Sequence, residues 1–146
     1  MATIRKQIID AFVTAIDGIA GINKVTTDIT IYSGDDAGDY PKVLVTASKP
    51  EVEIFAYDHP TADDREARME VSISGIVHNI NSANIRGDLD AIMEDIEQAV
   101  ETSSTLAGLT TECHLLSDEI DEDLDQNYGI FSAVYFVEYL YNHNTP

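Results

Sequence analysis

The segment "GIFSAVYFVEYLYN", residues 129 to 142, restricts the possible folds of this chain more than any other stretch. Successive side chains of a β-strand point to opposite faces. One face of the expected strand is formed by Phe131, Ala133, Tyr135, Val137, Tyr139 and Tyr141. The other face is formed by Ile130, Ser132, Val134, Phe136, Glu138 and Leu140. Because both faces are largely apolar, a strand with water on one side does not fit this pattern.

Two arrangements would cover both faces of this strand. Either the strand is central and covered within its own chain, or a neighbouring subunit covers one face. A domain with two helices has little material for a second face, and tyrosine-rich surfaces are typical of interfaces, which favours the neighbour. The candidate subunit interface consists of Tyr135, Val137, Tyr139 and Tyr141. Replacing Tyr135 or Tyr139 by Asp should then block self-association.

Two segments have the periodicity of helices that pack along one side. The first covers residues 3–19, with Thr3 as the expected N-cap and Gly18 and Gly21 as the stop. The second is marked by a stripe in which apolar residues recur every three or four positions. That stripe is Ile85, Leu89, Ile92, Ile96 and Ala99.

The remaining alternating or β-branched segments are expected to be strands. They are 25–32, 42–48, 69–78 and 110–117, with a short edge strand at 51–55. Exposed loops are expected at 33–40, 56–68 and 117–128. The order is helix, strands, helix, strand, strand. It predicts an α+β fold in which two helices pack on one face of a mostly antiparallel sheet. A length of 146 residues predicts a single domain over 1–146.

The charge of the chain is strongly negative. The formal net charge is −19, and the 60 residues from Gly87 onward contain fourteen acids and no Lys or Arg. DNA, RNA and anionic membranes need basic residues to replace their counterions, so we expect no specific nucleic-acid partner and no membrane partner. The sequence has no apolar run long enough to cross a membrane, and "MATIRKQIID" lacks a signal core. We therefore expect assembly in a reducing cytoplasm.

An acidic cluster lies directly before the last strand. It consists of Asp118, Glu119, Asp121, Glu122, Asp123 and Asp125. The aspartates at 121, 123 and 125 have the spacing of a calcium-binding EF-hand loop. However, Gln126 stands where that loop needs Gly, and Ser132 stands where it needs a bidentate Glu. A solvated loop or an interface for a basic partner fits this segment better than a metal site.

The residues that usually carry catalysis or bind metals form no motif. The single cysteine, Cys113, excludes a disulfide framework and a Cys-rich zinc site, and we expect a buried or half-buried strand thiol. The four histidines form no HxH or HxxxH pair, and neither a nucleophile elbow nor a phosphate loop is present. We expect no cofactor, no metal and no enzymatic activity. A hidden catalytic constellation would perturb the titration of His78 or His114.

Three stretches together match a known family pattern. They are "IRKQIIDAFVTAIDGIAGI", the run from "RMEVSISGIV" through "LDAIMEDIEQAVETSSTLAGL", and "FSAVYFVEYLYN". In these stretches and in the order of its elements, the chain resembles the tail terminator family of long-tailed bacteriophages. This family is also called tail completion protein or minor tail protein U.

The resemblance implies a structural virion protein. Such a protein forms a ring, commonly a hexamer, on the last ring of tail tube protein, ends tube polymerisation and offers a surface for head–tail connector proteins. The tyrosine-rich strand would supply part of a side-to-side contact. The acidic residues would line a lumen through which DNA slides without sticking. The loops 33–40, 56–68 and 117–128 would make contacts along the ring axis.

A second hypothesis needs no ring. The chain would be a small acidic binding module, an inhibitor or a DNA mimic, that engages a basic partner through residues 118–125. Its binding would weaken steeply with salt, because salt screens charge attraction.

Overall fold

The computed structural model of the chain describes residues 3–27, 41–48, 51–54, 64–78, 85–123 and 128–142. In these residues three helices accompany a sheet of six strands. The helices are α1 (Ile4–Asp17), α3 (Ile85–Glu101) and α4 (Ser104–Leu109). The strands are β1 (Lys24–Thr26), β2 (Lys42–Ala47), β3 (Glu51–Ile54), β4 (Asp64–His78), β5 (Glu112–Asp123) and β6 (Tyr128–Asn142).

The sheet is mostly antiparallel. Its strand order is β1-β2-β4-β6-β5, and β3 pairs with β4 beside this path. Only β1 and β2 are parallel; the other pairs of described strands are antiparallel. Strands β4 and β6 pair along their whole length, from Asp64 opposite Asn142 to His78 opposite Tyr128. These two strands are the centre of the sheet.

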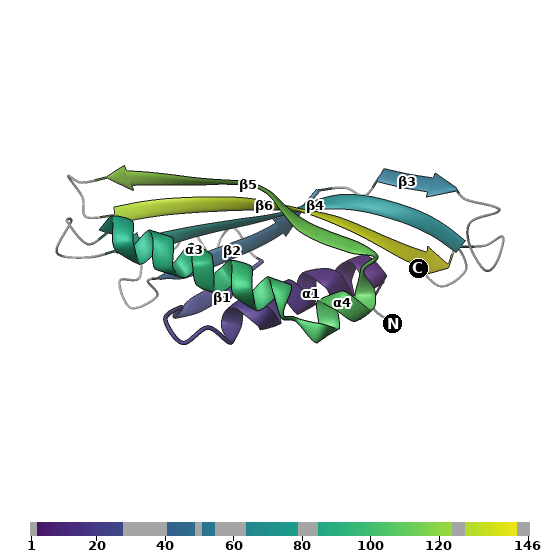
Figure 1. The fold of residues 1–146 in the computed structure, drawn as a ribbon, viewed down its shortest axis with the longest axis horizontal. Helices are drawn as coiled ribbons and strands as arrows, with labels where there is room; N and C mark the ends of the chain where they lie inside the picture. Colours follow the sequence, from purple (N-terminus) through teal and green to yellow (C-terminus); the bar gives the residue numbers. More distant parts are fainter. Residues whose placement is uncertain are drawn as a thin grey trace.

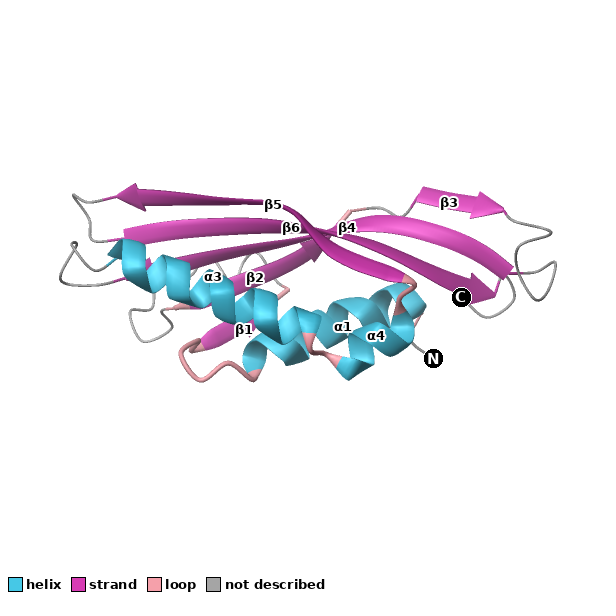
Figure 2. Cartoon of the chain, in the orientation of Figure 1, coloured by secondary structure: helices cyan, strands magenta, loops and turns pink. Residues whose placement is uncertain are grey.

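All three helices lie on one side of this sheet (Figures 1 and 2). Helix α1 contacts β1 and β2, α3 contacts β4, β5 and β6, and α4 contacts β5. The expected α+β class, with helices on one face of a mostly antiparallel sheet, is therefore confirmed.

Helix α1 begins and ends where its sequence signals predict. The Thr3 side chain accepts a hydrogen bond from the Lys6 backbone N–H at 3.1 Å, and the Gly18 N–H donates to the Thr14 carbonyl at 3.2 Å. Its buried side, which includes Phe12, faces the sheet. The rings of Phe12 and Tyr135 meet edge to face at 5.6 Å between centroids. Such a contact contributes about 0.5–1.5 kcal/mol beyond burial of the area.

Helix α3 lies close to the backbone of β6 at one end. A Cβ atom at Gly129 would collide with the side chains of Ile85 and Leu89. The buried residues of α3 are Ile85, Leu89, Ile92, Ile96 and Val100. They continue the predicted stripe, except that Val100 takes the last buried place and Ala99 is only partly buried.

The structure corrects three sequence expectations. Besides the two expected helices, residues 104–109 form a third helix, α4. It is capped by the Ser103 side chain, which accepts a hydrogen bond from the Leu106 N–H at 3.2 Å. Strand β4 begins at Asp64, so residues 64–68 of the expected loop 56–68 are strand paired with β3 and β6. Residues 117–123 of the expected acidic loop belong to β5, because they pair with β6. The expected loop 33–40 lies outside the described residues, as does most of the expected strand 25–32.

Gly75 on β4 provides room for the ring of Phe131 on β6. The two residues are directly opposite, and a Cβ atom at Gly75 would overlap that ring. Phe131 is almost completely buried, so it has little freedom to move away.

We expect Gly75→Ala to destabilise the fold by about 1–3 kcal/mol, because overpacking forces the neighbouring ring or the backbone to shift. The matched change Gly87→Ala lies in α3, where an added Cβ meets nothing within 4 Å. That change should stabilise by up to about 1 kcal/mol, because Gly is a poor helix former. Urea unfolding midpoints of the two variants would test this. Equal stability of Gly75→Ala and the unchanged protein would contradict the packing described for Phe131.

Candidate functional site

The candidate site is the sheet face opposite the helices, which we call the open face. On β6 it consists of Ile130, Ser132, Val134, Phe136, Glu138 and Leu140, and on β4 of Glu66, Arg68, Glu70, Ser72, Ser74 and Ile76. In the described part of the chain no helix covers this face (Figure 2). Toward β2, Leu44 and Lys42 on the same face are buried. The uncovered area therefore lies over β4, β6 and β5.

One end of the open face is apolar. Ile130 is 45% exposed, and its neighbour Ile76 on β4 is directly opposite and half-buried. Val134, four residues further along β6, is also half-buried. On β5, Leu116 sits at a register shift between Leu115 and Ser117 and is 48% exposed. Ile130 and Leu116 are the exposed large hydrophobic side chains of the described residues.

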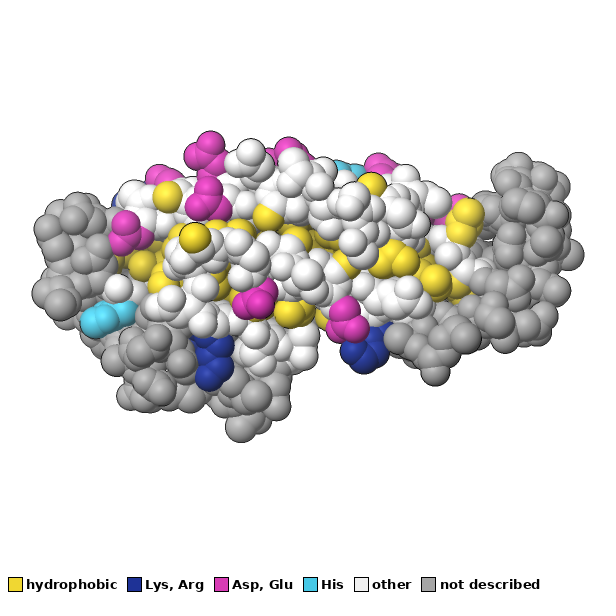
Figure 3. Space-filling model, turned by 90° about the horizontal axis from the view of Figure 1, so that it is seen from below, with side chains coloured by type: hydrophobic (Ala, Val, Ile, Leu, Met, Phe, Trp, Pro, Cys, Tyr) yellow, Lys and Arg dark blue, Asp and Glu magenta, His cyan; other side chains and the backbone are white. Residues whose placement is uncertain are grey.

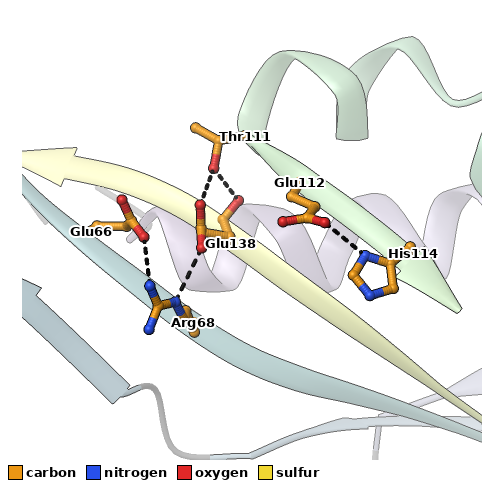
Figure 4. Close-up of polar contacts among 6 residues, drawn as sticks. All are labelled: Glu66, Arg68, Thr111, Glu112, His114 and Glu138. Carbon is orange, nitrogen blue, oxygen red and sulfur yellow. Dashed lines mark hydrogen bonds and ion pairs between the residues drawn. The ribbon is translucent and has the colours of Figure 1, made fainter. Parts of the chain in front are cut away.

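The other end of the open face carries a chain of polar contacts across three strands (Figure 4). Arg68 on β4 donates from Nε to Glu138 Oε2 at 3.1 Å and from Nη2 to Glu66 Oε1 at 3.2 Å. The hydroxyl of Thr111 donates to the Glu138 carbonyl at 3.1 Å and lies 3.3 Å from Glu138 Oε1. These contacts tie the start of β5 to β6 and β4.

His114 and Glu112 extend this polar end onto β5. The His114 Nδ1 atom lies 3.1 Å from Glu112 Oε1, and its ring lies 5.2 Å from the ring of Phe136. His114 is on the open face, whereas Cys113 points to the helix side, where it packs against the core. The structure thus does not bring these two neighbours together as a catalytic pair.

The ionisation of Glu138 depends on these contacts. Partial burial would raise the pKa of Glu138. The side-chain hydrogen bonds that Arg68 and Thr111 donate, together with the positive charge of Arg68, outweigh burial and hold the pKa below its usual value. Glu138 is therefore ionised at neutral pH and is an acceptor for Arg68.

Most of the predicted subunit interface lies in the core. Tyr135, Val137 and Tyr139 are 3%, 0% and 4% exposed, and they belong to the face that this chain's own helices cover. Burial raises the pKa of both tyrosines. These three side chains cannot form an interface with a neighbour, so that prediction is wrong for them. Tyr141, the fourth residue, is half-buried and packs against the same core, with its ring 6.1 Å from that of Tyr139.

The acidic residues lie on the outermost strand. Asp118 and Glu119 are exposed on β5, and the backbone of residues 121–123 continues that strand. Asp125 lies outside the described residues. A groove of about 420 Å³ separates β5 from α3. Its lining includes Asp90, Glu94, Glu97, Asp118 and Glu119. Among the described residues no group of three or more His, Cys, Asp or Glu is placed to hold a metal ion.

Cys113 is half-buried, as its position in a strand predicted. Burial raises the pKa of its thiol to about 11, so the thiol stays protonated at neutral pH. It is a packing residue next to the core.

The helical side of the molecule carries a second groove, of about 680 Å³, between α1 and the segment that joins α3 to α4. Small residues such as Ala11 and Ala15 and the hydroxyl residues Thr102 and Thr105 line it. Figure 3 shows the molecule from below, which is the side on which α1 and α4 lie in Figure 1. Acidic side chains are scattered over this side and along its upper edge. None of the helices in the described ranges is long and apolar enough to cross a membrane.

No protein-family model matches the chain, and no curated protein sequence matches it. The chain is similar to one chain of a solved structure described as the virion of a native gene transfer agent particle. The two chains share 14% sequence identity, and the TM-score is 0.47. The match covers 95% of this chain and 92% of that chain.

We expect the Arg68–Glu138 pair to stabilise the fold at neutral pH and to lose this effect in acid. A depressed carboxyl pKa contributes stability above the unfolded pKa, about 4.3, and that contribution disappears as the pH falls through the lower folded pKa. A double-mutant cycle with Arg68→Ala and Glu138→Ala should give a coupling of about 0.2–1 kcal/mol at pH 7, since both side chains are partly exposed.

The cycle should be measured by urea unfolding at pH 7 and again at the lowest pH at which the protein remains folded. The coupling should shrink in acid. A coupling of the same size at both pH values would show that ionisation of Glu138 does not contribute to it.

Proposed function

We propose that the chain is a structural protein of a phage-like virion, without enzymatic activity. It assembles into a ring that caps the tail tube, ends tube polymerisation and provides a surface for the head–tail connector proteins. The observation that carries this proposal is the open face. It is a broad sheet surface with an apolar end that the helices of the same chain leave uncovered.

An open face of this kind is suited to contact with another copy. Burying apolar area on association is favourable at roughly 25 cal/mol per Å², and side chains such as Ile130 and Val134 would supply it. A ring needs a heterologous contact, in which one surface of a subunit meets a different surface of the next. The open face would be one of these two surfaces. The resemblance described above implies six copies.

The charge of the chain supports a role around DNA without binding it. A ring of subunits with formal charge −19 each would present a wall that repels phosphates. DNA could pass through such a ring without adhering. We propose that the protein resides in the virion after assembly in the host cytoplasm, with tail tube and connector proteins as its partners.

The same charge opposes association between copies. Subunits that are all strongly negative repel one another, and the repulsion is screened within about 8–10 Å near physiological salt. We expect rings to be scarce at low ionic strength and more abundant with Mg²⁺ or added salt. Sedimentation velocity across a salt series would measure this. Association that weakens as salt rises would contradict a contact driven by apolar burial against charge repulsion.

Replacing an exposed apolar residue of the open face by an acid should prevent ring formation. We choose Ile130→Glu, because a side chain that is 45% exposed can be changed without opening the core. Its matched control is Gln98→Glu, which makes the same change in charge on the exposed side of α3. We expect Ile130→Glu to weaken association by at least about tenfold, or about 1.4 kcal/mol, and the control to leave it nearly unchanged.

Negative-stain imaging and sedimentation of both variants would measure the effect, with circular dichroism to show that each is folded. If Ile130→Glu forms rings of normal size and abundance, the open face is not part of the subunit contact. Tube ends from purified tails should be added in a second series, because a ring could need them to nucleate.

A further inference from the structure

Strand β5 leaves one long edge of the sheet without a partner strand. Within the described residues it pairs with β6 alone, and it ends the strand order of the sheet (Figure 1). Its residues Glu112–Asp123 would span roughly 40 Å at about 3.3 Å per residue. An unpaired edge presents a row of backbone N–H and C=O groups that can pair with another strand.

A bulge divides this edge into two parts. The register with β6 shifts between Leu115 and Ser117, which leaves Leu116 without an opposite residue. A bulge bends its strand and interrupts regular pairing. From Ser117 to Asp123 the register with β6 runs without a shift, so this part of the edge can accept an added strand.

Acidic residues border this part of the edge on both faces of the sheet. Glu119 lies on the open face, opposite Ser132, and Asp118 lies on the helix side, opposite Ala133. Below Asp118, the groove between β5 and α3 adds Asp90, Glu94 and Glu97 from the helix. Arg86 also lines this groove, with its Nε 3.8 Å from Asp90 Oδ2, so the acids outnumber the one base in the lining. The volume of this groove, about 420 Å³, is room for long side chains that come from a neighbouring strand.

We propose that the edge of β5 from Ser117 to Asp123 receives an extended segment of a different protein, which continues the sheet and carries Lys or Arg at alternate positions. The backbone of β5 provides the pairing, and the acids of β5 and α3 select a basic sequence. Cross-strand pairs of opposite charge are stabilising, and like charges directly opposite are destabilising. A second copy pairing through its own β5 would place acids against acids.

Strand addition at this edge does not require a ring, because the surface named above for the subunit contact is the open face. Strand addition is a known way in which a sheet edge takes up an extended peptide, with backbone hydrogen bonds for affinity and side chains for specificity.

The test uses the full chain, labelled for NMR, and two synthetic peptides of about eight residues, close to the length of a strand. In the first peptide lysine alternates with threonine. The second has the same sequence with alternate backbone nitrogens methylated, which keeps the charge and removes the hydrogen bonds of one edge. Binding constants come from titration at low salt, and amide hydrogen exchange reports new backbone pairing on β5.

We expect the first peptide to bind with changes centred on residues 117–123 and slower exchange of their amides. The methylated peptide should bind at least about tenfold more weakly, because strand addition needs the backbone hydrogen bonds. The double variant Asp118→Lys and Glu119→Lys should also weaken binding at least about tenfold. The control pair Asp17→Lys and Asp95→Lys, with the same change in charge on exposed helix positions, should stay within about twofold.

Three results would overturn the proposal. Equal binding of the methylated peptide would show attraction by charge alone. An equal loss of peptide binding in the two double variants would show that binding responds to the net charge of the protein and not to the acids at the edge of β5. No binding at low salt would show that the acids and the bulge only protect the edge against added strands. Imaging the same variants without peptide tests the ring separately, so failure of one proposal does not decide the other.

Discussion

The structure depends on the burial of one face of the paired strands β4 and β6 beneath α1 and α3. Strands β4 and β6 alternate strictly, so the residues on the helix side form the core while their neighbours form the open face. A shift of the register by one residue would exchange the two faces, which the helices do not tolerate. Gly75 leaves room for the Phe131 ring, and Gly129 leaves room for the side chains of α3. Both glycines therefore further restrict the register of β4 and β6 and the position of α3.

Much of the fold could be predicted because it follows from local periodicity. The stripe of α1, the stripe of α3 and the alternation in β4 each indicate their element without reference to the rest of the chain. Helix α4 was missed because its six residues are too few to show a stripe. The extended start of β4 and the acidic part of β5 were missed because charged residues favour loops. Pairing with β3 and β6 overrides this preference.

The candidate site was harder to predict than the fold. Both faces of β6 are apolar, and its sequence does not say which face the helices cover. The sequence favours a neighbouring subunit over a central strand as the cover of the tyrosine-rich face, whereas Phe12 of α1 packs against Tyr135 on that face. The contacts among Arg68, Glu138 and Thr111 were also not predictable, because they depend on a register between segments far apart in the chain. The acidic residues were recognised from the sequence, but their position on a sheet edge was not.

The place of β6 in the sheet has a consequence for the order in which the chain folds during synthesis. Strand β6 comes last among the described elements and yet lies between β4 and β5. Until it emerges from the ribosome, β5 has no partner, and the helices have only part of the surface on which they pack. Domains generally fold as units, and contacts between distant segments form late. A chain that stops short of β6 therefore cannot complete its core, and it also lacks Ile130 and the rest of the apolar surface that β6 contributes. The strand that completes the fold is also the one that carries much of the open face, so an unfinished chain lacks both its core and this surface.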